Sequence, residues 1–159
     1  AIELGANIGL NLKALHDFQP GAHLECVEIN QKAVAQLRQM EWLGKVYEGS
    51  LLEFEAQRKY ELAFTRGVLI HINPECLPTC YDLLYQSSSK YILVDEYYNP
   101  APVTVNYRGN SDRLFKRDFA GEMMDRYSDL ELVDYGFTYH RDPSYPLDDT
   151  TWFLLQKKQ

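Results

Sequence analysis

The 159-residue chain lacks several features that would place it in a specialised class of protein. It has no apolar run near the roughly 18 residues that a membrane-spanning helix needs, and no secretory signal stands at its start. Basic residues are in deficit, with 16 lysines and arginines against 23 aspartates and glutamates and a net charge of −7. Nucleic-acid-binding domains carry a basic surface, so we expect neither a nucleic-acid partner nor insertion in a membrane.

Cysteine is also scarce, and the three cysteines form no paired C-x-x-C motif. Cys76 and Cys80 lie four residues apart on an expected helix, where they can be a metal or redox pair or two small buried apolar residues. We favour burial, and Cys26 completes an odd count that fits no disulfide framework. We therefore expect no metal site and a reducing, cytoplasmic location.

What the sequence does contain is an alternation of strand and helix signals. Helix signals follow Ile8, Asn30, Asn73 and Asp118, and residues 100–110 read as a long loop. We predict a single α/β domain over residues 1–159: a Rossmann-like open twisted sheet of about seven strands, mostly parallel with an antiparallel C-terminal strand, and helices on both faces. The expected strands cover residues 2–4, 23–29, 45–48, 62–65 with an apolar continuation over 67–72, 91–95, 130–140 and 151–156.

The first strand runs into a glycine loop, ELGANIG, whose glycines Gly5 and Gly9 bracket three residues. The dinucleotide motif G-x-G-x-x-G is missing, because its second and third glycines would fall at Asn7 and Leu10. Glu3, just before the loop, would repel a diphosphate and suits a ligand with positive charge. Glu28 closes the second strand, where a carboxylate can accept both hydroxyls of a ribose. The loop therefore favours a cationic ligand that carries adenosine.

The order and spacing of four segments resemble the successive motifs of class I S-adenosylmethionine (SAM)-dependent methyltransferases. These segments are ELGANIG, VEIN, YEGSLLEF and FTRGVLIHI, and the resemblance covers essentially the whole chain. The segments GANIGLNL, RGVLIHINPE and NSDRLFKRDFAGEMMDRY further resemble methylases associated with pseudaminic acid biosynthesis. Enzymes of this class carry helices ahead of the first strand, so we expect residues preceding Ala1 to supply them.

This resemblance implies SAM as the cofactor and a role for each loop. The first loop would wrap the methionine and ribose portions, Glu28 would accept the ribose hydroxyls, and Ile29 would lie against adenine. Ser50 stands where the family often has an acid for the adenine amino group. The implied cofactor-binding residues are Glu3, Gly5, Ala6, Asn7, Gly9, Glu28, Ile29, Gly49, Ser50, Leu51, Thr65 and Arg66.

Three residues at the carboxyl ends of strands are candidate general bases for the acceptor: His71, Glu96 and His140. Each has a structural alternative. His71 stands in an apolar run, where a histidine commonly packs in the core. Glu96 follows Asp95 directly, so the two side chains point to opposite faces of a strand. His140 precedes a long polar loop that leaves its position open.

The segment after the fifth strand carries the candidate acceptor-binding residues. Tyr97, Tyr98 and Tyr107 can form an aromatic wall or can simply pack. Arg108 and Arg113 begin the only basic cluster of the chain, either a solvated face or a site for an anionic acceptor. We predict methyl transfer to a small polar acceptor, an acidic sugar of the pseudaminic or nonulosonic type or its nucleotide-linked form. An inactive cofactor-binding scaffold and a nicotinamide-dependent oxidoreductase are the alternatives.

Overall fold

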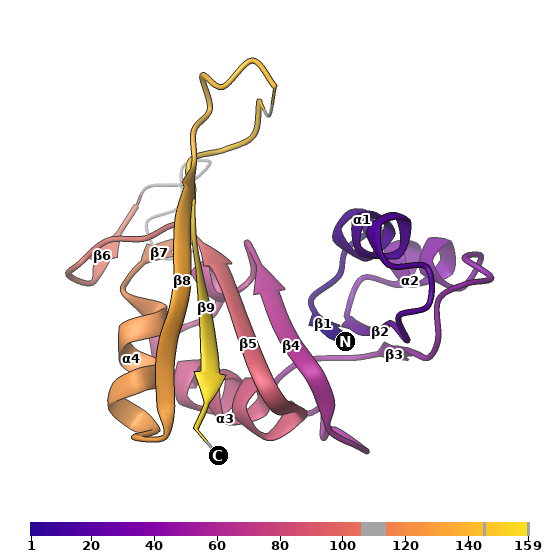
Figure 1. Cartoon of the computed structure of the whole chain (residues 1–159), viewed down its shortest axis with the longest axis horizontal. Coiled ribbons are helices and arrows are strands. Elements are labelled where there is room, and N and C mark those ends of the chain that lie inside the picture. Colours follow the sequence, from indigo (N-terminus) through magenta and orange to yellow (C-terminus); the bar gives the residue numbers. More distant parts are fainter. Residues whose placement is uncertain (106–113, 145, 159) are drawn as a thin grey trace.

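A computed structural model describes residues 1–105, 114–144 and 146–158 of the chain. Within them a seven-stranded sheet runs in the order β3-β2-β1-β4-β5-β9-β8 (Figure 1). The first five strands pair in parallel, whereas β9 is antiparallel to both of its neighbours. The predicted Rossmann-like sheet with an antiparallel C-terminal strand is confirmed.

The element bounds follow the alternation of strand and helix closely. The strands of the sheet are β1 (Ile2–Leu4), β2 (Glu25–Glu28), β3 (Val46–Glu48), β4 (Tyr60–Arg66), β5 (Ser88–Glu96), β8 (Leu130–Thr138) and β9 (Thr150–Lys157). The helices are α1 (Leu10–Phe18), α2 (Gln31–Leu37), α3 (Leu77–Ser87) and α4 (Phe119–Arg126), with the short 3-10 helices η1 (Leu69–His71) and η2 (Pro74–Cys76).

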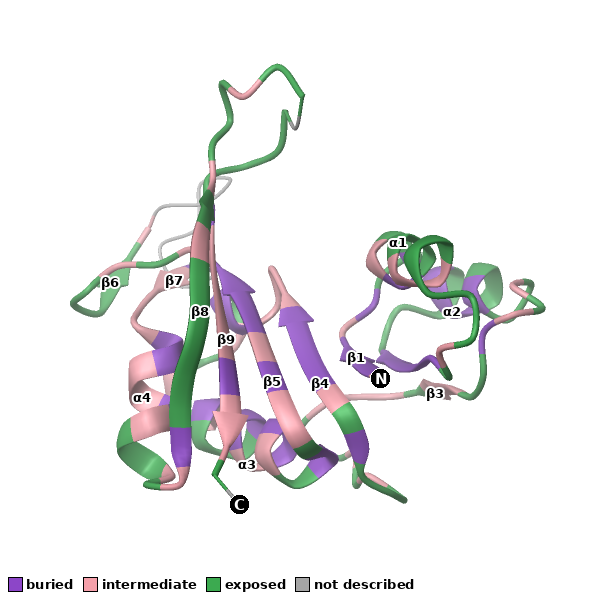
Figure 2. Cartoon of the chain, in the orientation of Figure 1, coloured by how far each residue is buried: buried purple, intermediate pink, exposed green. Residues whose placement is uncertain are grey.

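Helices cover both faces of the sheet, and each face has its own core (Figure 2). On one face Leu12 of α1 and Leu37 of α2 pack with Phe64 of β4. On the other, α3 and α4 pack on the sheet, and Cys80 is buried there among apolar side chains. Alternate residues of a strand point to opposite faces, so a strand between two helical layers is apolar throughout.

Two expectations about local structure were wrong. Residues 67–72 do not continue the fourth strand, because β4 ends at Arg66 and Gly67 takes a φ of +63°. The apolar run then forms η1, which buries Leu69 and Ile70 against the sheet. The loop expected over 100–110 contains a short strand, β6 (Val103–Thr104), which pairs with β7 (Phe115–Lys116). The left-handed turn at Gly67 ends the strand at the first site, and a long-range pairing forms the strand at the second.

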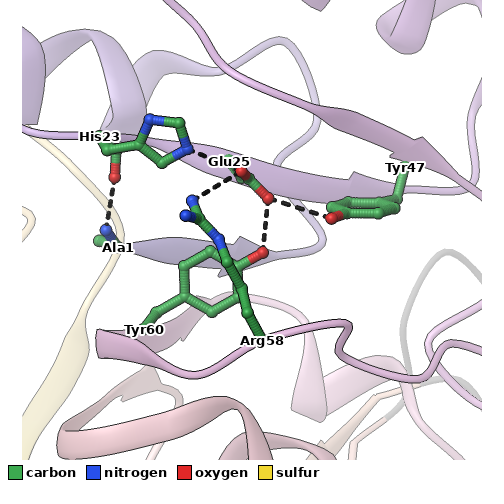
Figure 3. A network of polar contacts seen from close by, with 6 residues as sticks. All are labelled: Ala1, His23, Glu25, Tyr47, Arg58 and Tyr60. Atoms are coloured by element: carbon green, nitrogen blue, oxygen red, sulfur yellow. Dashed lines mark hydrogen bonds and ion pairs between the residues drawn. The ribbon is translucent and has the colours of Figure 1, made fainter.

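The amino edge of the sheet is fastened by a polar network around Glu25, the first residue of β2 (Figure 3). Its carboxylate accepts hydrogen bonds from Tyr60 at 2.5 Å and Tyr47 at 3.1 Å, and pairs with Arg58 at 2.7 Å and His23 at 2.7 Å. Burial alone would raise the pKa of Glu25, but the hydrogen bonds outweigh it and lower the pKa. The network ties β2 to β3 and β4 at the edge opposite the glycine loop.

Candidate functional site

The site lies at the carboxyl edge of the sheet, where the strand order reverses between β1 and β4. In open α/β sheets this reversal leaves a crevice between the loops that follow the two strands. Two pockets of about 500 and 450 Å³ open there. They share the lining residues Gly5, Asn7, Gly67 and His71, so they form one continuous groove.

The glycine loop depends on a close approach between β1 and the segment after β4. Gly5 has a φ of +83°, and a Cβ at that position would lie 2.6 Å from a methyl carbon of Val68. The main-chain N–H of Gly5 donates to Val27 O at 2.9 Å, which holds the loop against β2. Gly9 has a φ of +80° and stands immediately before α1. Both positions need the left-handed backbone that glycine adopts freely.

Glu28 closes β2 with its carboxylate at the edge of the 450 Å³ pocket. Its Oε2 accepts from the N–H of Asn7 at 2.7 Å, and its Oε1 accepts from the N–H of Asn30 at 2.7 Å. The two hydrogen bonds orient the carboxylate and use one lone pair of each oxygen. A carboxylate offers about four acceptor positions, so two remain for hydroxyl donors of a ligand.

Apolar side chains form the walls of the pocket beside Glu28. Ile29 is 66% exposed although it is a large apolar residue, and it lines the pocket with Leu51, Leu52 and Ile72. On the same side the N–H of Gly49 donates to Glu28 O at 3.0 Å, and Ser50 Oγ accepts from the N–H of Leu52 at 3.2 Å. This pocket offers apolar surface to a planar ring and hydrogen-bond acceptors at one end.

A chain of polar side chains crosses the floor of the 500 Å³ pocket. Glu3 Oε1 accepts from Asn11 Nδ2 at 2.7 Å, and Asn11 Oδ1 accepts from Arg66 at 3.1 Å. Arg66 also pairs with Asp95 at 3.0 Å. Glu3 is fully buried, its Oε2 has no hydrogen-bond partner among the described residues, and burial raises its pKa to about 8. Asn11 and Arg66 line the pocket, so Glu3 communicates with it through Asn11.

The structure separates the three candidate bases. His71, at the end of η1, lines both pockets at their junction. Glu96 is 2% exposed and accepts from the N–H groups of Val68, Leu69 and Ile70 at 3.0, 3.1 and 3.4 Å. Burial raises the pKa of Glu96 to about 7 even though these N–H groups oppose the rise. Glu96 lines neither pocket of the groove, and its contacts assign it to holding η1 in place.

His140 lies in the connection between β8 and β9, which extends beyond the sheet (Figure 1). Its Nδ1 lies 2.9 Å from Oδ2 of Asp149, and its main-chain N–H donates to Oδ1 of Asp149 at 2.8 Å. Both side chains are about half exposed, and His140 is not a lining residue of the groove. In this structure His140 is therefore part of the loop and not of the groove wall.

Of the candidate acceptor-binding residues, Tyr97 lines the 500 Å³ pocket. Tyr98 lines neither pocket, and its ring lies 5.6 Å from that of Phe153. The remaining three candidates, Tyr107, Arg108 and Arg113, lie outside the described residues.

Most of the predicted cofactor-binding residues gather around the groove. Three of them line neither pocket. Glu3 is buried in β1, Gly9 stands immediately before α1, and Thr65 is buried near the end of β4. The sequence interpretation missed Asn11, although its position in the first turn of the helix after the loop was a signal. It also missed Leu147, Asp148 and Thr150, which the β8–β9 connection brings to the pocket. No local pattern marks these three.

The comparison with solved structures supports the fold described above, whereas no protein-family model and no curated protein matches the sequence. Magnesium protoporphyrin IX methyltransferase from Synechocystis PCC 6803 with bound SAM is 14% identical with a TM-score of 0.71, over 99% of this chain and 69% of that one. The 1,6-didemethyltoxoflavin-N1-methyltransferase of Burkholderia thailandensis is 14% identical with a TM-score of 0.73, over 100% and 72% of the two chains.

The glycopeptide N-methyltransferase MtfA complexed with SAM is 11% identical with a TM-score of 0.72, over 99% of this chain and 81% of that one. At these identities the likeness establishes the fold of class I methyltransferases for this chain. Among the described residues, no three histidine, cysteine or acidic side chains group as metal ligands. In the same part of the chain, no helix has the length and apolarity needed to cross a membrane.

Proposed function

We propose that this protein is a SAM-dependent methyltransferase that acts on a small polar acceptor. The observation that carries the proposal is the carboxylate of Glu28, held at 2.7 Å by two main-chain N–H groups beside an apolar pocket. Its free lone pairs suit the two vicinal hydroxyls of a ribose, and Ile29 and Leu51 suit the faces of an adenine ring.

The other pocket suits the amino-acid end of SAM. Asn11 lies at the floor of this pocket, with the unpartnered Oε2 of the buried Glu3 behind it. An ammonium group near Asn11 would favour ionisation of Glu3, whose pKa burial raises to about 8. Arg66 uses only part of its five N–H donors in its contacts with Asp95 and Asn11, and the rest suit a carboxylate.

When bound, SAM supplies a methyl group on a sulfonium, which an acceptor atom takes while the sulfur keeps the electron pair. The chain must position the acceptor and keep water away, and alignment of two reactants contributes about 7–11 kcal/mol in favourable cases. His71 lies where the two pockets meet and is the candidate base that this geometry supports best. Its role is to hold or accept the proton of the acceptor.

Calorimetric titration tests the cofactor. We expect S-adenosylhomocysteine (SAH) and SAM to bind, and NADH not to bind, because Asn7 and Leu10 stand where the dinucleotide motif has its second and third glycines. Binding of NADH in preference to SAH would overturn the proposal. An inactive scaffold would also bind SAH, so the second readout is transfer of a labelled methyl group to an acceptor.

For the acceptor, the segments that resemble methylases of pseudaminic acid biosynthesis support a sugar of that type, free or nucleotide-linked. Methyltransferases of the same fold are named for small molecules such as a toxoflavin precursor, which supports a small acceptor. The free thiols of Cys26, Cys76 and Cys80 support a cytoplasmic location. Assays of sugars that do and do not carry the nonulosonic acid skeleton test the acceptor class.

A further inference from the structure

Part of the lining of the 500 Å³ pocket comes from the end of the connection between β8 and β9 and from the first residue of β9. Leu147, Asp148 and Thr150 line this pocket together with Ala6 and Asn7 of the glycine loop. The two groups of residues are separated by more than 130 positions in the sequence, and the tertiary fold brings them to one cavity. The lining of this pocket therefore includes an acidic side chain, Asp148, from the C-terminal part of the chain.

Tyr97 fixes the position of that acidic side chain. Its hydroxyl donates to Oδ2 of Asp148 at 2.8 Å, and Tyr97 itself directly follows β5 at the carboxyl edge of the sheet. The hydrogen bond uses one acceptor position of the carboxylate. The remaining acceptor positions of Asp148 are therefore available to a hydrogen-bond donor in the pocket. The end of β5 fixes where this carboxylate lies, because Tyr97 follows that strand directly.

The charge balance of the described lining is also informative. Asp148 is its only carboxylate among the residues that the structure describes, and Arg66 is its only arginine or lysine. The guanidinium of Arg66 is held by Asp95 at 3.0 Å and by Asn11 at 3.1 Å on the floor of the pocket. Within the described part of the chain, no salt bridge joins Asp148 to Arg66. Lys116 lies outside the lining, with its Nζ 5.2 Å from the centroid of the Tyr97 ring.

We infer that the acceptor presents an amino group, which Asp148 and Tyr97 bind at the methyl-transfer end of the groove. This inference rests on the proposed function and names the reacting group of its substrate. An ammonium group donates hydrogen bonds to a carboxylate, whereas an acidic group at the same place would be repelled by Asp148. The amino group can belong to a sugar, and a carboxylate elsewhere on that sugar would lie away from Asp148.

The proton balance of this reaction gives Asp148 a defined role. The acceptor ammonium loses one proton, which His71 accepts and passes to solvent. The lone pair of the neutral nitrogen then forms the new bond to the methyl carbon while the C–S bond breaks toward sulfur. The nitrogen regains a positive charge as this bond forms, and the product is a methylated ammonium. The carboxylate of Asp148 stabilises the charge that develops on the nitrogen. It is a binding and electrostatic group, and it need not take the proton.

The test compares two ligands that need no knowledge of the acceptor. SAH is uncharged at the transfer position, and sinefungin carries an amino group there on an otherwise similar molecule. We expect the wild-type protein to bind sinefungin about 10-fold more tightly than SAH. In Asp148→Asn this preference should fall to less than about 2-fold, and in Tyr97→Phe it should fall part of the way.

Asp149→Asn is the matched control, because Asp149 is the adjacent carboxylate in the same loop but contacts His140 and does not line the pocket. It should keep the wild-type preference. Equal affinity of the wild-type protein for both ligands, or an unchanged preference in Asp148→Asn, would overturn this inference alone. Failure of both ligands to bind would overturn the proposed function and this inference together.

Discussion

The main-chain N–H of Asn7 donates to Oε2 of Glu28 at 2.7 Å, although 21 residues separate the two positions. The bond joins the glycine loop after β1 to the end of β2. Asn7 has a φ of +47°, a left-handed conformation that non-glycine residues adopt uncommonly. Glu28 therefore stabilises the shape of the loop that lines the groove, and we propose that its remaining acceptor positions bind the ligand.

Replacement of Glu28 tests both functions. In Glu28→Ala a ribose loses two hydrogen bonds to a charged acceptor and the loop loses its contact at Asn7. We expect the Kd for SAH to rise by about 10- to 150-fold, equivalent to roughly 1.5–3 kcal/mol. Calorimetry measures the change, and Glu48→Ala at the end of the neighbouring β3 is the control with unchanged affinity. A Kd for Glu28→Ala equal to that of the wild type would remove Glu28 from the binding site.

Gly5→Val tests the close approach between the glycine loop and Val68. The new Cβ would meet a methyl carbon of Val68 at 2.6 Å, and a φ of +83° is unfavourable for valine. We expect SAH binding to be lost while circular dichroism still shows the folded sheet. Gly21→Val, at an exposed glycine with no atom within 4 Å of the added Cβ, should bind SAH normally. Normal affinity in Gly5→Val would refute the placement of the cofactor.

The buried Glu3 predicts a particular dependence of stability on pH. Burial raises its pKa in the folded protein to about 8, whereas the unfolded chain releases the same proton at an ordinary carboxyl pKa of 4.5. Between these values the folded state holds more protons, so the free energy of unfolding falls as pH rises, by at most about 1.4 kcal/mol per pH unit. Urea titrations from pH 5 to 8 measure this slope.

Glu3→Gln should remove that contribution, so the variant should gain stability relative to the wild type as the pH approaches 8. Glu131→Gln, at an exposed position of β8, should retain the wild-type slope. Parallel curves for Glu3→Gln and the wild type would show that Glu3 ionises normally in the fold.

Glu96 is predicted to act on structure and not on proton transfer. Its carboxylate accepts from three N–H groups at the start of η1, the segment that carries His71 to the groove. Glu96→Ala leaves these buried donors without a partner, so we expect a loss of about 2–4 kcal/mol in the free energy of unfolding. We also expect weaker SAH binding, because Val68 and His71 line the groove. Full stability with loss of turnover would instead identify Glu96 as a base.

The network around Glu25 provides a contrasting prediction. Glu25→Ala removes the acceptor shared by Tyr60, Tyr47 and Arg58 at the amino edge of the sheet (Figure 3). We expect urea denaturation to show a loss of about 2–4 kcal/mol. The Kd for SAH should stay within about 2-fold of the wild-type value, because the groove lies at the opposite edge. A large change in SAH affinity at unchanged stability would contradict this separation of roles.

The local order of residues was enough to predict the sheet and the loops after β1, β2 and β3 that line the groove. Strands buried on two faces are mostly apolar, and a turn with positive φ favours glycine at Gly5. Glu28 is recognisable as an acid that closes a strand. Each of these signals is contained in a few neighbouring residues, and the alternation of strand and helix then puts the strand ends at one edge. Sequence alone therefore determined the fold class and the loops that line the expected cofactor pocket.

The tertiary structure decided the roles that depend on distant partners. Glu96 ends an apolar strand and His71 stands in an apolar run. The main-chain N–H groups of residues 68–70 nevertheless bind the carboxylate of Glu96, whereas His71 lines the groove. Likewise, only the antiparallel pairing of β5 with β9 brings Asp148 to Tyr97, 51 residues away. Whether a polar side chain is buried by main-chain donors or faces a cavity depends on what the fold packs against it, and no local pattern contains that information.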